Sequence, residues 1–230
     1  MSEPSYKFLC AALASCVGLA HAAELPPLDA TVSYDSTTVT HAGVTETRRF
    51  RNILIRRPGH VWMERMVPDQ VETSHHHDAS EAGHKHVDFD ISTQHLTRSA
   101  NGDIRAEYID RDQRQIVYVP PTEYSISGFD GSWDNAAEMV AEKTVLAMPL
   151  STRPTTIADT AWHEEARNGW YNRVLWSTHD KVALEVESGK SDGSTTRRTV
   201  LSLRPATPDY ALPWKRLGGY AQKEYDDFMD

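Results

Sequence analysis

The chain is poor in cysteine. Its 230 residues include 2 cysteines, Cys10 and Cys16, and both lie close to the start of the sequence. The rest of the protein therefore contains no disulfide, no thiolate nucleophile and no cysteine-based zinc site. A domain built from it must be held together by its hydrophobic core, and a hydrophobic content of 39% is enough for one.

Long apolar runs, net positive charge and catalytic motifs are scarce as well. Beyond residues 8–19, no apolar run approaches the roughly 18 residues that a membrane-spanning helix needs. The 33 acidic and 24 basic residues give a net charge of -9, which argues against a general nucleic-acid-binding surface. A G-x-S-x-G elbow, a phosphate-binding loop and a dinucleotide-binding glycine pattern are missing, so an enzyme is the least favoured class of protein.

The apolar run over residues 8–19 is typical of an export signal. Lys7 precedes it, and Ala20-His21-Ala22 follows it as a small-x-small cleavage site. We therefore expect a signal peptide over residues 1–22 and a single domain over residues 23–230, located in the periplasm.

A second interpretation of the same segment stays open. Leu13-Ala14-Ser15-Cys16 resembles a bacterial lipobox, the motif in which a cysteine receives a lipid. Under that interpretation Cys16 becomes the lipidated N-terminus, and the protein is a membrane-anchored lipoprotein. Membrane association is expected in this case only.

The remaining sequence is dominated by strand patterns. Short segments rich in Val, Thr, Ile and Tyr alternate between apolar and polar residues, and turn dipeptides such as Asn168-Gly169 separate them. Two helices are predicted, over residues 132–147 and 214–228, and no βαβ unit is visible. The fold class is therefore mainly β with a few helices (α+β), as a curved antiparallel sheet. The expected strands span residues 30–40, 44–56, 60–67, 85–91, 94–98, 104–109, 115–119, 160–176 (a hairpin), 181–187 and 194–203.

A dense group of histidines lies in a predicted loop over residues 72–88. It holds 5 of the 11 histidines within 12 positions. Imidazole and carboxylate groups are ligands for zinc and copper, and in an extended segment His84, His86 and Asp88 would point to one face. The alternative is a solvated loop whose histidines have no cellular role. The candidate metal ligands are His75, His76, His77, His84, His86 and Asp88.

Two further motifs carry a family resemblance. The segment from Asn52 to Trp62, with Arg57-Pro58-Gly59 at its centre, is followed by Pro68-Asp69, and Gln115–Pro120 forms a second matching strand. Together they resemble the periplasmic lipoprotein carrier LolA and its RseB-like relatives. The resemblance implies an unclosed β-barrel whose concave face is covered by helices. It also implies a protein that binds acyl chains or lipidated partners and is not an enzyme.

The resemblance also suggests a ligand pocket. Arg57 matches the basic residue that holds the helical cover by hydrogen bonds to backbone carbonyls, and Val61 takes the place of a lining phenylalanine. Among the 6 tryptophans, Trp62 and Trp176 are candidates for the pocket wall, although the ordinary place of strand tryptophans is the core. The chain departs from the family in having no amphipathic helix before its first strand.

Two functions follow from these observations. The first is an exported, non-enzymatic binding protein whose histidine-rich loop holds a divalent zinc or copper ion on a LolA-like scaffold. The alternative is a periplasmic carrier or sensor of lipid or lipoprotein acyl chains, with the histidines incidental.

Overall fold

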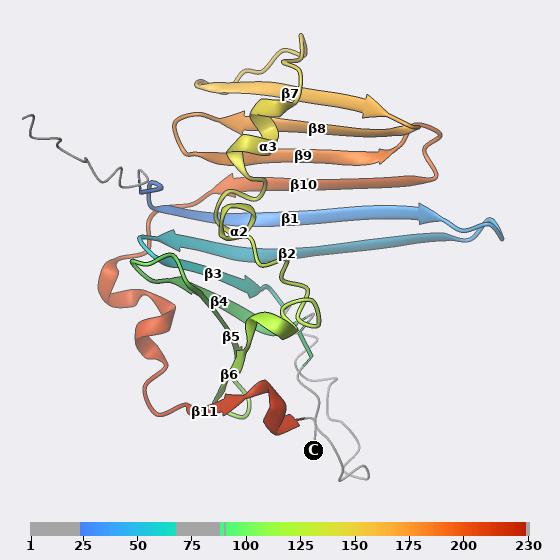
Figure 1. Ribbon diagram of the computed structural model, residues 1–230. Helices are drawn as coiled ribbons and strands as arrows, with labels where there is room; N and C mark the ends of the chain where they lie inside the picture. Colours follow the sequence, from blue (N-terminus) through green and yellow to red (C-terminus); the bar gives the residue numbers. More distant parts are fainter. Residues whose placement is uncertain (1–23, 68–87, 90, 229–230) are drawn as a thin grey trace, which may run out of the picture.

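The computed structural model describes residues 24–67, 88–89 and 91–228 (Figure 1). The predicted signal peptide over residues 1–22 lies outside this part of the chain, and so do both cysteines. The same holds for the predicted ligands His75, His76, His77, His84 and His86.

The described residues form one sheet of 11 strands, in the order β11-β6-β5-β4-β3-β2-β1-β10-β9-β8-β7. Every neighbouring pair is antiparallel except β11 and β6, which run parallel. Figure 1 shows β3 to β6 inclined to β7 to β10, and the two end strands do not pair with each other. The predicted fold class, a mainly β protein with an unclosed barrel, is confirmed. The strands are β1 (Leu28–Val39), β2 (Thr45–Arg57), β3 (His60–Arg65), β4 (Thr93–Arg98), β5 (Ile104–Asp110), β6 (Gln115–Val119), β7 (Thr160–Arg167), β8 (Trp170–Ser177), β9 (Val182–Lys190), β10 (Thr195–Leu203) and β11 (Ala221–Glu224).

Two short helices lie across one face of this sheet (Figure 1). The predicted helix over residues 132–147 is divided into α2 (Trp133–Glu138) and α3 (Glu142–Ala147). The division lies at Met139, whose φ of 66° is incompatible with a right-handed helix. Ser132 caps α2, because its hydroxyl accepts a hydrogen bond from the amide of Asn135 at 3.2 Å.

The C-terminal segment differs from the prediction. The expected helix over residues 214–228 is instead a 3-10 turn η3 (Pro213–Arg216), the strand β11 and a second 3-10 turn η4 (Tyr225–Phe228). Gly218-Gly219 interrupts the helical spacing, and Gly219 has a φ of 81°. The prediction of a helix here was therefore wrong, and a short turn η2 (Asp209–Ala211) precedes η3.

Alternate residues of β2 and β3 point to opposite faces of the sheet and serve two separate cores. Leu54 and Val61 belong to the core that includes Ala137 of α2. Ile55 and Trp62 belong to a second core that includes Leu212 and is extended by Trp214. The helices therefore cover one face, while the segment after β10 covers the other face of the same strands.

Candidate functional site

Arg56 is the most deeply buried charged side chain in the described part of the molecule, with 1% of its surface exposed. The side chains of β2 alternate between the two faces of the sheet, so Arg56 lies on the same helix-covered face as Leu54. Its guanidinium donates to backbone carbonyl oxygens in the lead-in to β1, in α2 and in the turn after β8. These oxygens belong to Pro26 (2.9 Å), Ala137 (2.7 Å), Lys181 (2.9 Å) and Asp180.

The electrostatics of Arg56 are unusual for a buried cation. Its hydrogen bonds go to carbonyl dipoles, and burial lowers its pKa to about 10. The carboxylates of Glu138 and Asp180 act in the opposite direction and favour the charged form. The charge is thus stabilised by carbonyl groups from several segments that meet around it.

Arg57, the next residue, points to the opposite face. Its Nη1 lies 2.5 Å from Oδ1 of Asp29, and its Nη2 donates to the carbonyl of Thr207 at 3.0 Å. Asp29 also accepts the amide of Thr207 at 2.8 Å. The resemblance assigns the contact with the helical cover to Arg57, but the geometry assigns that contact to Arg56. Arg57 instead fixes the C-terminal segment to β1.

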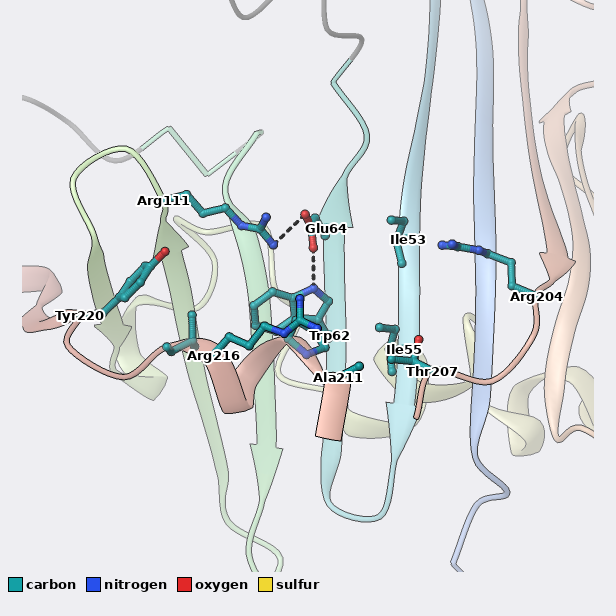
Figure 2. A pocket seen from close by; sticks show the side chains of 12 residues that line it. Ile53, Ile55, Trp62, Glu64, Arg111, Arg204, Thr207, Ala211, Arg216 and Tyr220 are labelled. Atoms are coloured by element: carbon teal, nitrogen blue, oxygen red, sulfur yellow. Dashed lines mark hydrogen bonds and ion pairs between the residues drawn. The ribbon is translucent and has the colours of Figure 1, made fainter. Parts of the chain in front are cut away.

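A groove of about 370 Å³ lies on the face opposite α2, between β2, β3 and residues 204–220 (Figure 2). Its apolar wall comes from alternate positions of the strands and from the segment packed over them. Polar side chains stand around this wall. The lining residues are Ile53, Ile55, Trp62, Glu64, Arg111, Arg204, Thr207, Ala211, Pro213, Arg216, Leu217 and Tyr220.

Polar contacts fix part of the groove wall. The indole Nε1 of Trp62 donates to Glu64 at 2.9 Å, and Arg111 pairs with the other oxygen of Glu64 at 2.7 Å (Figure 2). Figure 2 also shows Arg204 on one side of the isoleucines and Arg216 on the other. Both of these arginines are exposed, and their side chains make no hydrogen bond or ion pair with the described residues.

The four predicted pocket residues do not converge on this groove. Trp62 lines it, and Arg57 supports it through Thr207. Val61 lies in the core on the opposite face, and Trp176 packs in a third core with residues of α3 and the segment after it. Sequence reasoning missed Arg204 and Arg216, because single arginines in loops carry no pattern.

The predicted metal ligands are only partly placed. Asp88, the one that the structure describes, begins a turn in which its carbonyl accepts the amide of Ser92 at 3.0 Å. The predicted strand over residues 85–91 is therefore not formed in its described part. Within residues 24–67, 88–89 and 91–228, no three His, Cys, Asp or Glu side chains form a group that could hold a metal ion.

A histidine pair lies beside the groove. His60 and His95 approach to 3.1 Å between Nδ1 and Nε2, and Trp214 stacks on both rings at 4.9 and 5.4 Å. His95, whose Nδ1 lies 3.6 Å from a carboxylate oxygen of Glu107, and then Arg105 lower the pKa of Glu107. His95 is 5% exposed, so this pair packs η3 onto the sheet as part of the second core's edge.

Comparison with protein-family models and with curated proteins finds no match for the chain. No helix within the described ranges has the length and hydrophobicity that crossing a membrane requires.

Several solved structures are similar in outline. An uncharacterized conserved protein from Thermus thermophilus has a TM-score of 0.44 at 10% identity, over 86% of this chain and 90% of that one. A putative outer membrane lipoprotein-sorting protein domain from Vibrio parahaemolyticus has a TM-score of 0.32 at 9% identity, over 82% and 91%. A DUF1329 family protein from Desulfovibrio piger has a TM-score of 0.31 at 8% identity, over 83% and 92%.

Proposed function

We propose that this chain is a non-enzymatic carrier or sensor that holds an acyl chain of a lipid or lipoprotein between the sheet and α2. The observation that carries this proposal is the set of hydrogen bonds made by Arg56. A buried cation contributes little net stability compared with an apolar residue of similar size. A guanidinium that joins the sheet to α2 through backbone carbonyls is, in contrast, a connection that can be broken and remade.

The surface beneath that connection is apolar. Leu54 is fully buried, and Val61 is 1% exposed. Ala137 of α2 is 0% exposed, and it belongs to the same core. If α2 moves away from Arg56, this core opens to a chain of methylene groups, which gain about 25 cal/mol for each Å² removed from water. In this mechanism the closed arrangement is the unloaded state.

Substitution of Arg56 tests this mechanism. The probes are a fluorescent triacylated peptide and hydrogen exchange of the amides in residues 133–147. An Arg56→Gln variant cannot reach all four carbonyls, so we expect several-fold faster uptake of the peptide and faster exchange in α2 and α3. The matched control is Arg57→Gln, which alters the neighbouring residue on the other face and should leave uptake unchanged.

Two results would contradict the proposal. One is a wild-type protein that takes up no acylated peptide at any concentration tested. The other is an Arg56→Gln variant with the uptake rate and the α2 exchange of the wild type.

We also propose that the histidine-rich segment binds a zinc or copper ion, with ligands drawn from His75, His76, His77, His84, His86 and Asp88. The density of 5 histidines in 12 positions supports this second function. Calorimetric titration of tag-free protein with Zn²⁺ or Cu²⁺ should show one site, which the double variant His84→Ala/His86→Ala removes. Titration without stoichiometric binding would reject this function.

The last part of the proposal concerns where the protein is located. We propose a periplasmic protein, released after cleavage at Ala22 or anchored through Cys16. A Cys16→Ser variant distinguishes the two, because it shifts the protein from the membrane fraction to the soluble fraction only if the lipid anchor exists.

A further inference from the structure

The groove in Figure 2 combines an apolar wall with cations at its rim. Ile53, Ile55 and Leu217 supply the apolar surface, and the fully buried ring of Trp62 lies behind it. A volume of about 370 Å³ falls within the range of roughly 300–1,000 Å³ that is common for small-molecule sites. The groove is thus large enough for one small ligand with an apolar body.

The charge of the groove is opposite to that of the whole protein. It contains three arginines and one glutamate, which leaves two positive charges in excess, while the chain as a whole carries -9. Arg111 is paired with Glu64, so it acts as part of the wall. The side chains of Arg204 and Arg216 have no hydrogen-bond or ion-pair partner in the described part of the chain and are available to an anion. A guanidinium binds a carboxylate through two parallel hydrogen bonds.

The groove is also formed in advance. Trp62 has 0% exposure and is fixed by Glu64. The segment that closes the groove is fixed at Thr207 by both Arg57 and Asp29. A site that needs no ordering loses less entropy when a ligand binds.

We propose that this groove binds a single-chain amphiphile with a carboxylate head, such as a medium-chain fatty acid. The chain lies against Ile53 and Leu217, and the carboxylate pairs with Arg204 or Arg216. A diacyl phospholipid is too large for a groove of about 370 Å³, so a single chain with a small planar head is the better fit. This site lies on the face opposite α2 and does not depend on the opening proposed for Arg56.

Calorimetry with decanoate, decanol and decyltrimethylammonium, each below its micelle concentration, tests the head group. We expect decanoate to bind at least about tenfold more tightly than either other compound, and added salt to weaken it. The double variant Arg204→Gln/Arg216→Gln should lose this preference and keep only the weak binding of decanol. The control Lys215→Gln removes a neighbouring cation that pairs with Asp209, and it should bind decanoate like the wild type.

A second pair of variants assigns the binding to this face. Ile53→Glu places a negative charge on the half-buried wall and should abolish decanoate binding. Arg56→Gln should leave the affinity for decanoate unchanged, whatever its effect on the acylated peptide. The proposal is overturned if decanol binds as well as decanoate, or if Arg56→Gln alone removes the binding. It is also overturned if decyl phosphate, titrated as a fourth compound, binds tenfold more tightly than decanoate.

Discussion

Asp29 links the beginning of the sheet to the segment that closes the groove, and an Asp29→Asn variant tests this link. The side chain of Asp29 is 4% exposed, and that of its partner Arg57 is 14% exposed. Its two oxygens accept Nη1 of Arg57 at 2.5 Å and the amide of Thr207 at 2.8 Å. Asparagine has nearly the same shape but carries no charge, and one of its two acceptors becomes a donor.

The expected loss follows from these contacts. The charged hydrogen bond contributes about 1.5–3 kcal/mol, and a buried donor that faces another donor costs about 1–3 kcal/mol. Arg57 keeps the carbonyls of Arg56 at 2.8 Å and of Thr207 at 3.0 Å, so its charge is not left without acceptors. The free energy of unfolding should therefore fall by about 3 kcal/mol, the lower end of the range for breaking a buried ion pair.

Urea denaturation followed by tryptophan fluorescence measures this loss, provided that the slope of the transition stays constant. The double variant with Arg57→Gln completes a thermodynamic cycle, in which the coupling between the two residues should exceed about 1 kcal/mol. A loss below about 1 kcal/mol, or a coupling near zero, would show that the pair does not hold the C-terminal segment.

Two other predictions concern backbone packing and pH. A Cβ at Gly189 would lie 2.3 Å from the carbonyl oxygen of Thr195, so Gly189→Ala should destabilise the protein by more than about 2 kcal/mol in the same urea assay. The control Gly218→Ala should cost little, because the space around Gly218 is open. Equal effects of the two substitutions would count against the close approach of β9 and β10. Burial, and then the charge of His95, lowers the pKa of His60 below its usual 6.5, so the unfolded chain binds the proton first and stability should fall as the pH drops below that value. His60→Gln should make this fall shallower, and an unchanged pH profile of the urea midpoint would refute the assignment.

The strands were predictable because their residues alternate. Val182, Leu184 and Val186 indicated β9, and Asn168-Gly169 indicated the turn between β7 and β8, where both residues have positive φ (53° and 76°). The position of this turn was predicted correctly, because few dipeptides adopt this geometry without strain.

The functional residues were harder to predict, because they depend on register and on distant contacts. Whether Arg56 or Arg57 faces the helices is decided by the pairing of β2 with β1, and a shift of one residue exchanges their roles. Met139 takes a positive φ that its own side chain does not favour. Arg204 and Arg216 border the same groove only because the chain returns across β2 and β3 after β10.

The C-terminal strand has a consequence for synthesis. β11 pairs with β6 in parallel, through residues such as Gln222 and Lys223, which cover one side of β6. During translation β6 is made about a hundred residues before β11, at roughly 5–20 residues per second. For several seconds the backbone amides and carbonyls on the side of β6 away from β5 therefore have no strand beside them. A nascent chain with such an uncovered edge can pair with the strand edge of another nascent chain on the same messenger RNA. Truncations that remove β11 should therefore raise aggregation during expression more than they lower the stability of molecules that have already folded.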